Sequence, residues 1–121
     1  METGAGYRIA RPEELERSGD WRLVRLSLDC RAFGVNLVEI GPGASIPEHD
    51  EIERDQEELF YVVSGDATIV VDGAEHPAPA GTFARVDPER RRTVRGAGDG
   101  PTTVLIVSAP RTSGYEPMDW A

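Results

Sequence analysis

Short apolar runs alternate with turn residues along most of this chain. About eight of these runs have the length and the residue types of β-strands. The predicted strands are Trp21–Leu28, Phe33–Ile40, Leu59–Val63, Thr68–Val71, Glu75–Ala78, Phe83–Val86, Thr93–Arg95 and Thr102–Ser108. Close spacing of strands and turns predicts an all-β fold, either a β-sandwich or a small antiparallel barrel.

The pattern predicts one short helix, at Arg11–Ser18 near the N-terminus. A proline and two glutamates stand in its first turn, where they are favourable, and Gly19 ends it. The sharpest turn signal is Asp72-Gly73, which predicts a tight hairpin between the strands on either side.

A chain of 121 residues has room for one domain with a real core. We expect a single domain over 1–121, with an N-terminal extension (1–20), a barrel (21–108) and a tail (109–121). The net charge of −9 argues against nucleic acid and anionic membrane surfaces as partners. No apolar run suggests a signal peptide or a membrane span. Cys30 is the only cysteine, which fits a cytoplasmic protein.

The candidate chemistry is concentrated in residues 41–65, where a lone histidine stands among carboxylates. Residues two apart on a strand share a face, so His49 and Glu51 can project together and Glu58 can join them from the next strand. An imidazole with two carboxylates suits Zn, Mn, Fe or Ni, and Gln56 is a possible fourth ligand. The alternative is a solvated acidic loop without a metal.

This segment resembles the first motif of the cupin family. That motif contains a glycine, five residues, His-x-His, three or four residues, a glutamate, six residues and a glycine. Gly43, His49 and the pair Glu58/Gly65 have the family spacing. Glu51 stands at the position of the motif's second histidine. Six residues separate it from Glu58, where the motif has three or four. The resemblance implies the antiparallel jelly-roll barrel of the family.

The second cupin motif is matched in its first half by Gly73 and by Pro79-Ala80-Gly81. Further on, Arg92 stands where the family has its third histidine ligand. A guanidinium stays protonated and has no lone pair for a metal, although it pairs well with carboxylates.

Two readings of Arg92 follow from this chemistry. In the first, Arg92 points into the barrel and pairs bidentately with Glu58 or Glu51, so that its charge replaces that of a metal. This reading predicts a direct contact between Arg92 and Glu58, and weak metal binding. In the second reading Arg92 points away, and a metal is held by His49 with the two glutamates.

Several other residues are candidates for the interior. Phe60 and Val62 share a strand face with Glu58, so we expect them to line the same cavity. Arg85 lies in the middle of a strand and can orient an anionic ligand if it faces inward. His76 is expected to be an exposed turn residue.

Three functions remain open at this point. The first is binding of a small polar or anionic molecule, with Arg92, Arg85, Glu58 and His49 orienting it. The second is the metal-dependent dioxygenase or isomerase chemistry that the cupin resemblance implies, with His49, Glu51 and Glu58 as ligands. The third is a structural homodimer with a vestigial cavity. The sequence leaves open whether any reaction is catalysed.

The composition of the tail predicts that it packs against another protein surface. It carries two prolines with Tyr115, Met118 and Trp120, and such a composition is not typical of disorder. We expect the tail to pack on its own barrel or on a neighbouring subunit, and we expect a homodimer.

Overall fold

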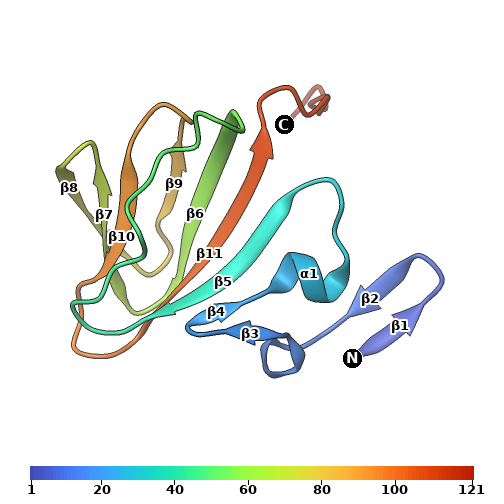
Figure 1. Cartoon of the computed structure of the whole chain (residues 1–121), viewed down its shortest axis with the longest axis horizontal. Coiled ribbons are helices and arrows are strands. Elements are labelled where there is room, and N and C mark those ends of the chain that lie inside the picture. Colours follow the sequence, from blue (N-terminus) through green and yellow to red (C-terminus); the bar gives the residue numbers. More distant parts are fainter.

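Two antiparallel β-sheets form the centre of the chain in a computed structural model that describes residues 1–121 (Figure 1). The larger sheet has six strands in the spatial order β3, β4, β5, β11, β6 and β9. Their bounds are Arg17–Ser18, Trp21–Arg22, Gly34–Ile40, Thr102–Pro110, Gln56–Ser64 and Phe83–Val86.

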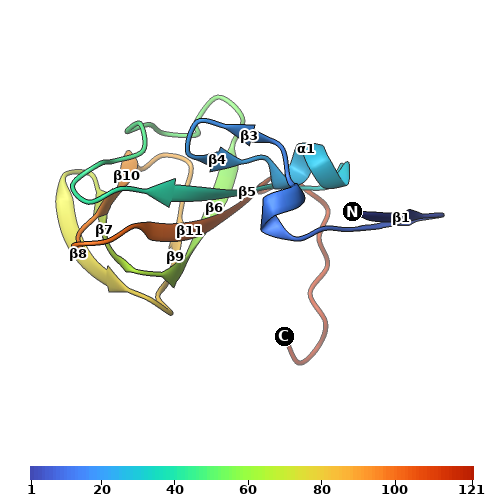
Figure 2. The same ribbon diagram turned by 90° about the horizontal axis from the view of Figure 1, so that it is seen from below.

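The smaller sheet has the order β10, β7 and β8, with the bounds Arg92–Gly96, Asp66–Val71 and Ala74–Pro79. A segment without regular strand structure extends it beyond β10, through bridges that pair Ser45 with Arg95 and His49 with Arg92. The two sheets face each other and enclose the core as a flattened barrel (Figures 1 and 2). The predicted all-β antiparallel barrel is therefore confirmed.

The inner face of the large sheet changes character along its strands. At one end, Val38, Val104 and Val62 lie opposite one another on β5, β11 and β6, and all three are fully buried. Four residues further along β11, Ser108 is paired with Gly34 on one side and Glu58 on the other. The sheet therefore supplies a dry core at one end and polar groups at the other.

The helix prediction was right in kind and wrong in position. Residues Arg11–Ser18 form only a 3-10 turn at Pro12–Glu14 (η1), and the short α-helix is Val24–Leu28 (α1). Apart from Pro12 in the first turn, Leu15 is the only apolar residue of the predicted helix, and one anchor cannot support an eight-residue amphipathic helix. The predicted strand Trp21–Leu28 shrinks to β4, because α1 follows it.

Six of the remaining predicted strands lie within observed ones, and Phe33–Ile40 begins one residue before β5. Asp72 and Gly73 both have positive φ, at 49° and 82°, and they join β7 to β8 as the sequence predicts. Gly65 has a φ of 83°, and a Cβ there would lie 2.6 Å from the carbonyl oxygen of Pro101. The closing glycine of the first motif is thus required by backbone angle and by close packing.

Both ends of the chain extend from the barrel. A small hairpin of β1 (Glu2–Gly4) and β2 (Tyr7–Ile9) projects at the N-terminus, and the C-terminal tail leaves the end of β11 (Figure 2). The side chains of Tyr115 and Trp120 are 76% and 83% exposed, so the tail aromatics do not pack on their own barrel. No helix of the chain is long and apolar enough to cross a membrane.

Candidate functional site

The backbone of the smaller sheet holds His49 in place. His49 and Arg92 exchange two backbone hydrogen bonds, 3.1 and 2.8 Å long, across the bridge beside β10. The ring nitrogen Nδ1 lies 2.9 Å from the carbonyl oxygen of Pro47, which can only accept. Nδ1 therefore carries a hydrogen and donates it, and the lone pair of the neutral ring is on Nε2.

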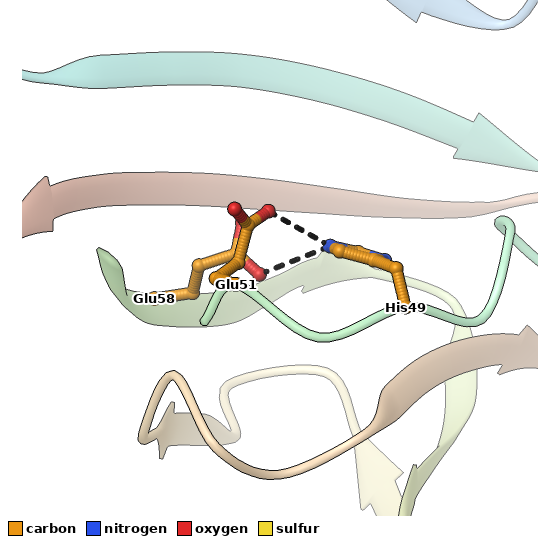
Figure 3. Close-up of side chains that lie close together, drawn as sticks. All are labelled: His49, Glu51 and Glu58. Atoms are coloured by element: carbon orange, nitrogen blue, oxygen red, sulfur yellow. Dashed lines mark ion pairs between the residues drawn. The ribbon is translucent and has the colours of Figure 1, made fainter. Parts of the chain in front are cut away.

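Two carboxylates face this lone pair, as Figure 3 shows. The Nε2 atom of His49 lies 3.1 Å from Oε1 of Glu51 and 3.5 Å from Oε1 of Glu58. The residues between the two glutamates form a turn, in which the amide of Gln56 donates to the carbonyl of Glu51. This turn accommodates the long spacer and returns the chain to β6, so the glutamates still meet.

Arg92 lies beneath this cluster and is completely buried. Its Nε is 3.2 Å from Oε1 of Glu58, which confirms the predicted direct contact. The rest of the guanidinium donates to the backbone carbonyls of Arg90, Val86 and Asp87, at 2.6, 3.4 and 3.2 Å. The expected bidentate pairing is therefore wrong, because the other guanidinium nitrogens are engaged by the backbone.

The contact between Arg92 and Glu58 is an ion pair without hydrogen-bond geometry. Both Nε of Arg92 and Oε1 of Glu58 are buried without a hydrogen-bond partner. Burial raises the pKa of the Glu58 carboxyl above its usual range, although the Arg92 guanidinium opposes this rise. The nearby Glu51 carboxylate raises the pKa further. The cluster thus contains a buried oxygen that lacks a full partner.

The donor atoms of His49, Glu51 and Glu58 fit a divalent cation. All of them lie within 4.8 Å of one another. Two ligand atoms that are each about 2.1 Å from a metal are about 3.0 Å apart at right angles and about 3.4 Å apart in a tetrahedron. The separations of 3.1 and 3.5 Å match these values. One nitrogen and two carboxylate oxygens also form a ligand set that zinc, manganese or iron accepts.

The cluster opens into a cavity of about 210 Å³. Apolar walls surround the three ligand candidates, and Asn36 and Ser108 add polar groups. The apolar lining includes Trp21, Val35, Ile46, Phe60 and Ile106. Phe60 lines the cavity as predicted. Val62 is instead buried in the core, one inward-facing position further from the open end.

Three other predicted residues lie elsewhere. Gln56 lines a neighbouring cavity with Arg54 and is not among the residues around the cluster. Arg85 is on the outside of β9, where its exposed side chain lies 3.6 Å from Asp87. His76 is exposed, as expected, but it lies in β8 and not in a turn. Arg92 itself is buried behind Glu58 and does not line the cavity.

The fold and the site together define a class of protein, namely small antiparallel barrels with a histidine–carboxylate cluster at the open end. The sequence pattern named "Cupin domain" matches residues 36–108, which is more than half of the chain. The chain belongs to the cupin family. A comparison with curated proteins gives no match.

Solved structures agree with this assignment. A cupin protein from Bacteroides fragilis is 22% identical with a TM-score of 0.78, over 95% of this chain and 92% of that one. A Cupin 2 conserved barrel domain protein from Salinispora arenicola is 22% identical with a TM-score of 0.65, over 93% and 92%. A cupin-superfamily sugar phosphate isomerase from Silicibacter pomeroyi is 28% identical with a TM-score of 0.65, over 74% of this chain and 57% of that one.

The two departures from the cupin motif compensate each other in charge. Glu51 adds a negative charge where the motif has a neutral histidine, and Arg92 adds a positive charge at the other histidine. With Glu58 ionised, the site has a charge of −1, the same as three neutral histidines and one glutamate. The exchange therefore alters the ligands but preserves the electrostatic balance that a divalent cation meets.

Proposed function

We propose that this cupin binds a divalent cation through His49, Glu51 and Glu58, and a small polar molecule in the adjoining cavity. One observation carries the proposal. The Nε2 atom of His49, with its lone pair, lies 3.1 and 3.5 Å from the two facing carboxylate oxygens, which are separations that two ligands of one metal ion have. A buried carboxylate oxygen without a hydrogen-bond partner is destabilising, and coordination to a cation would compensate for the missing hydrogen bond.

Each residue has a defined part in this proposal. Pro47 fixes the tautomer of His49, and Arg92 opposes the protonation of Glu58 from the side away from the cavity. Three protein ligands leave coordination positions for a bound molecule. If held by these residues, a cation would supply Lewis-acid polarisation of an oxygen of that molecule.

Metal-dependent isomerase chemistry is the second candidate function. It is favoured by the 28% identity to the protein named a sugar phosphate isomerase. The distinction between the two candidates is whether a bound molecule is turned over.

Metal analysis tests the proposal. Protein stripped with EDTA is dialysed against zinc or manganese, and bound metal is measured by plasma mass spectrometry. We expect one ion per chain, and at least about tenfold weaker binding in His49→Ala. Glu57→Gln is the matched control, because it removes a carboxylate next to Glu58 on the exposed face of β6. Unchanged binding in His49→Ala would contradict the proposal.

We also propose that the chain forms a homodimer through the outer face of the large sheet. Phe83 and Val63 are 68% and 45% exposed there, and the Phe83 ring stacks on Tyr61 with centroids 4.4 Å apart. These residues lie on β6 and on the edge strand β9. Contiguous exposed apolar residues on a sheet favour association with another protein surface.

Sedimentation of the purified chain tests the dimer. We expect a dimeric mass at micromolar concentration, and a shift towards monomer in Phe83→Asp. Leu26→Asp places the same charge on exposed α1 and is expected to leave the dimer intact. Deletion of 114–121 reports whether the tail contributes to the interface. A monomeric wild-type chain would refute the dimer.

A further inference from the structure

A second cavity lies next to the one at the histidine–carboxylate cluster. Its volume is about 470 Å³, and Gly34 and Ser108 line both cavities. Arg25, Arg31 and Arg54 line the second cavity, and no acidic residue does. This composition stands out in a chain with a net charge of −9.

These three arginines come from separate parts of the chain. Arg25 is in α1, Arg31 is in the loop that follows, and Arg54 is in the turn before β6. None of the three forms an ion pair, although eight of the 13 basic residues do. All basic residues of the chain are arginines, so five arginines lack ion pairs, and three of them line this one cavity.

Arginine side chains without carboxylate partners have hydrogen-bond donors to offer. The guanidinium fork recognises phosphate and carboxylate groups bidentately, and it is more weakly hydrated than an ammonium group. A cavity with three such groups concentrates positive potential. We infer that this cavity, formed by Arg25, Arg31 and Arg54, binds the phosphate or carboxylate group of a small molecule.

The two cavities are positioned to hold one molecule. In the sheet, Ser108 is paired with Gly34 on one side and with Glu58 on the other, so a single row of residues connects them. Gly34 contributes no side chain here, and the Oγ of Ser108 fills the space beside it, 2.6 Å from where a Cβ would lie. The anionic group lies in the arginine cavity, and the polar remainder of the molecule reaches the cluster.

This inference deepens the proposed function, because it names the substrate class of the same site. It also differs from the expectation from the sequence. An anionic ligand was expected to contact Arg92 and Arg85, but Arg92 is buried behind Glu58 and Arg85 is on the outer face.

Nuclear magnetic resonance of the arginine Nε–Hε groups tests the arginine cavity. Inorganic phosphate and acetate are titrated in turn into metal-free protein with EDTA, at constant ionic strength. We expect saturable shifts of the signals of Arg25, Arg31 and Arg54, and the tighter probe names the preferred group. Absence of saturable binding by both probes overturns the inference.

Variants decide whether binding is local. The triple variant Arg25→Gln, Arg31→Gln, Arg54→Gln should weaken binding of the tighter probe at least about tenfold. Arg54→Gln alone changes an exposed turn, so it provides a second test if the triple variant folds poorly. Arg11→Gln removes an exposed arginine outside the cavity and should change binding less than about twofold. Equal weakening by Arg11→Gln would overturn the inference, because binding would then follow net charge.

The anion and metal proposals can fail separately. Anion binding is measured without metal, so failure of the cation site leaves that result intact. Zinc binding by the triple variant is measured by dialysis, and we expect it to equal that of the wild type.

Discussion

The two ends of the large sheet use the same strands for different purposes. At the closed end, Val38, Val104 and Val62 form one row and exclude water. At the open end, the row through Ser108 contains Glu58, a buried carboxyl group. The three central strands β5, β11 and β6 keep one register through both rows, so within them the difference lies in the side chains. The apolar row at the closed end therefore stabilises the barrel, whereas burial of the Glu58 carboxyl group at the open end is destabilising.

The cost at the open end is limited by Arg92. This side chain has no exposed surface, and it balances the charge of Glu58 at 3.2 Å. Buried ion pairs contribute little net stability, but a buried charge without its partner is strongly destabilising. The comparison between the ends therefore predicts which substitutions are severe.

The largest effect is expected for Arg92→Met in metal-free protein. It leaves Glu58 without its cation and three backbone carbonyls without their donor, so unfolding free energy should fall by about 3–5 kcal/mol. Urea denaturation measures this change. Arg95→Met, on the same strand, breaks the exposed ion pair with Glu75 and should cost much less. Equal losses for the two variants would contradict the structural role of Arg92.

A smaller effect separates the two ends directly. Val104→Thr places a hydroxyl group in the dry row, where it lacks a partner, and should cost about 1–3 kcal/mol. Ser108→Ala removes a hydroxyl at the open end, where Ser108 is only half-buried, and should change stability little. Thermal and urea unfolding compare the pair. If Ser108→Ala costs as much as Val104→Thr, the difference between the ends disappears.

The smallest effect is the pH dependence of Glu58. Its pKa is raised in the folded state, so the folded protein binds this proton more tightly than the unfolded chain does. Its contribution to stability is therefore fully present below the unfolded pKa of about 4.5 and is lost as pH rises through the folded pKa. In EDTA, the stability of Glu58→Gln relative to the wild type should therefore increase as pH rises through this range. The control Glu57→Gln should show no such dependence on pH. If the wild type instead became more stable relative to Glu58→Gln as pH rose, the direction that we assign to the pKa shift would be wrong.

Much of the fold could be predicted from the sequence. Turn residues at close intervals defined the strands. The pair Asp72-Gly73 predicted a hairpin, and both residues have the positive φ that such a turn requires. The short helix could not be placed, because the five residues Val24–Leu28 are too few for a clear helical period. It ends at Asp29, which caps the helix in the left-handed conformation with a φ of 56°. The sequence pattern did not predict this cap.

The candidate site was predicted in part. The spacing of His49 and Glu51 predicted that they share a face, because side chains alternate along an extended chain. Glu58 joins them through the turn at residues 52–55. The arginine cavity was missed, since its residues are brought together only by tertiary folding of three segments. The one signal in the sequence was the exclusive use of arginine for positive charge. Trp21 was missed as a cavity residue because the pattern placed it in a long strand.

Anomalous diffraction at the zinc edge tests the central claim most directly. Crystals grown from EDTA-treated protein are soaked in excess zinc, and an anomalous map locates the metal. We predict one strong peak within bonding distance of Nε2 of His49 and of carboxylate oxygens of Glu51 and Glu58. A strong peak only at other acidic residues, with these three side chains free of metal, would contradict the account.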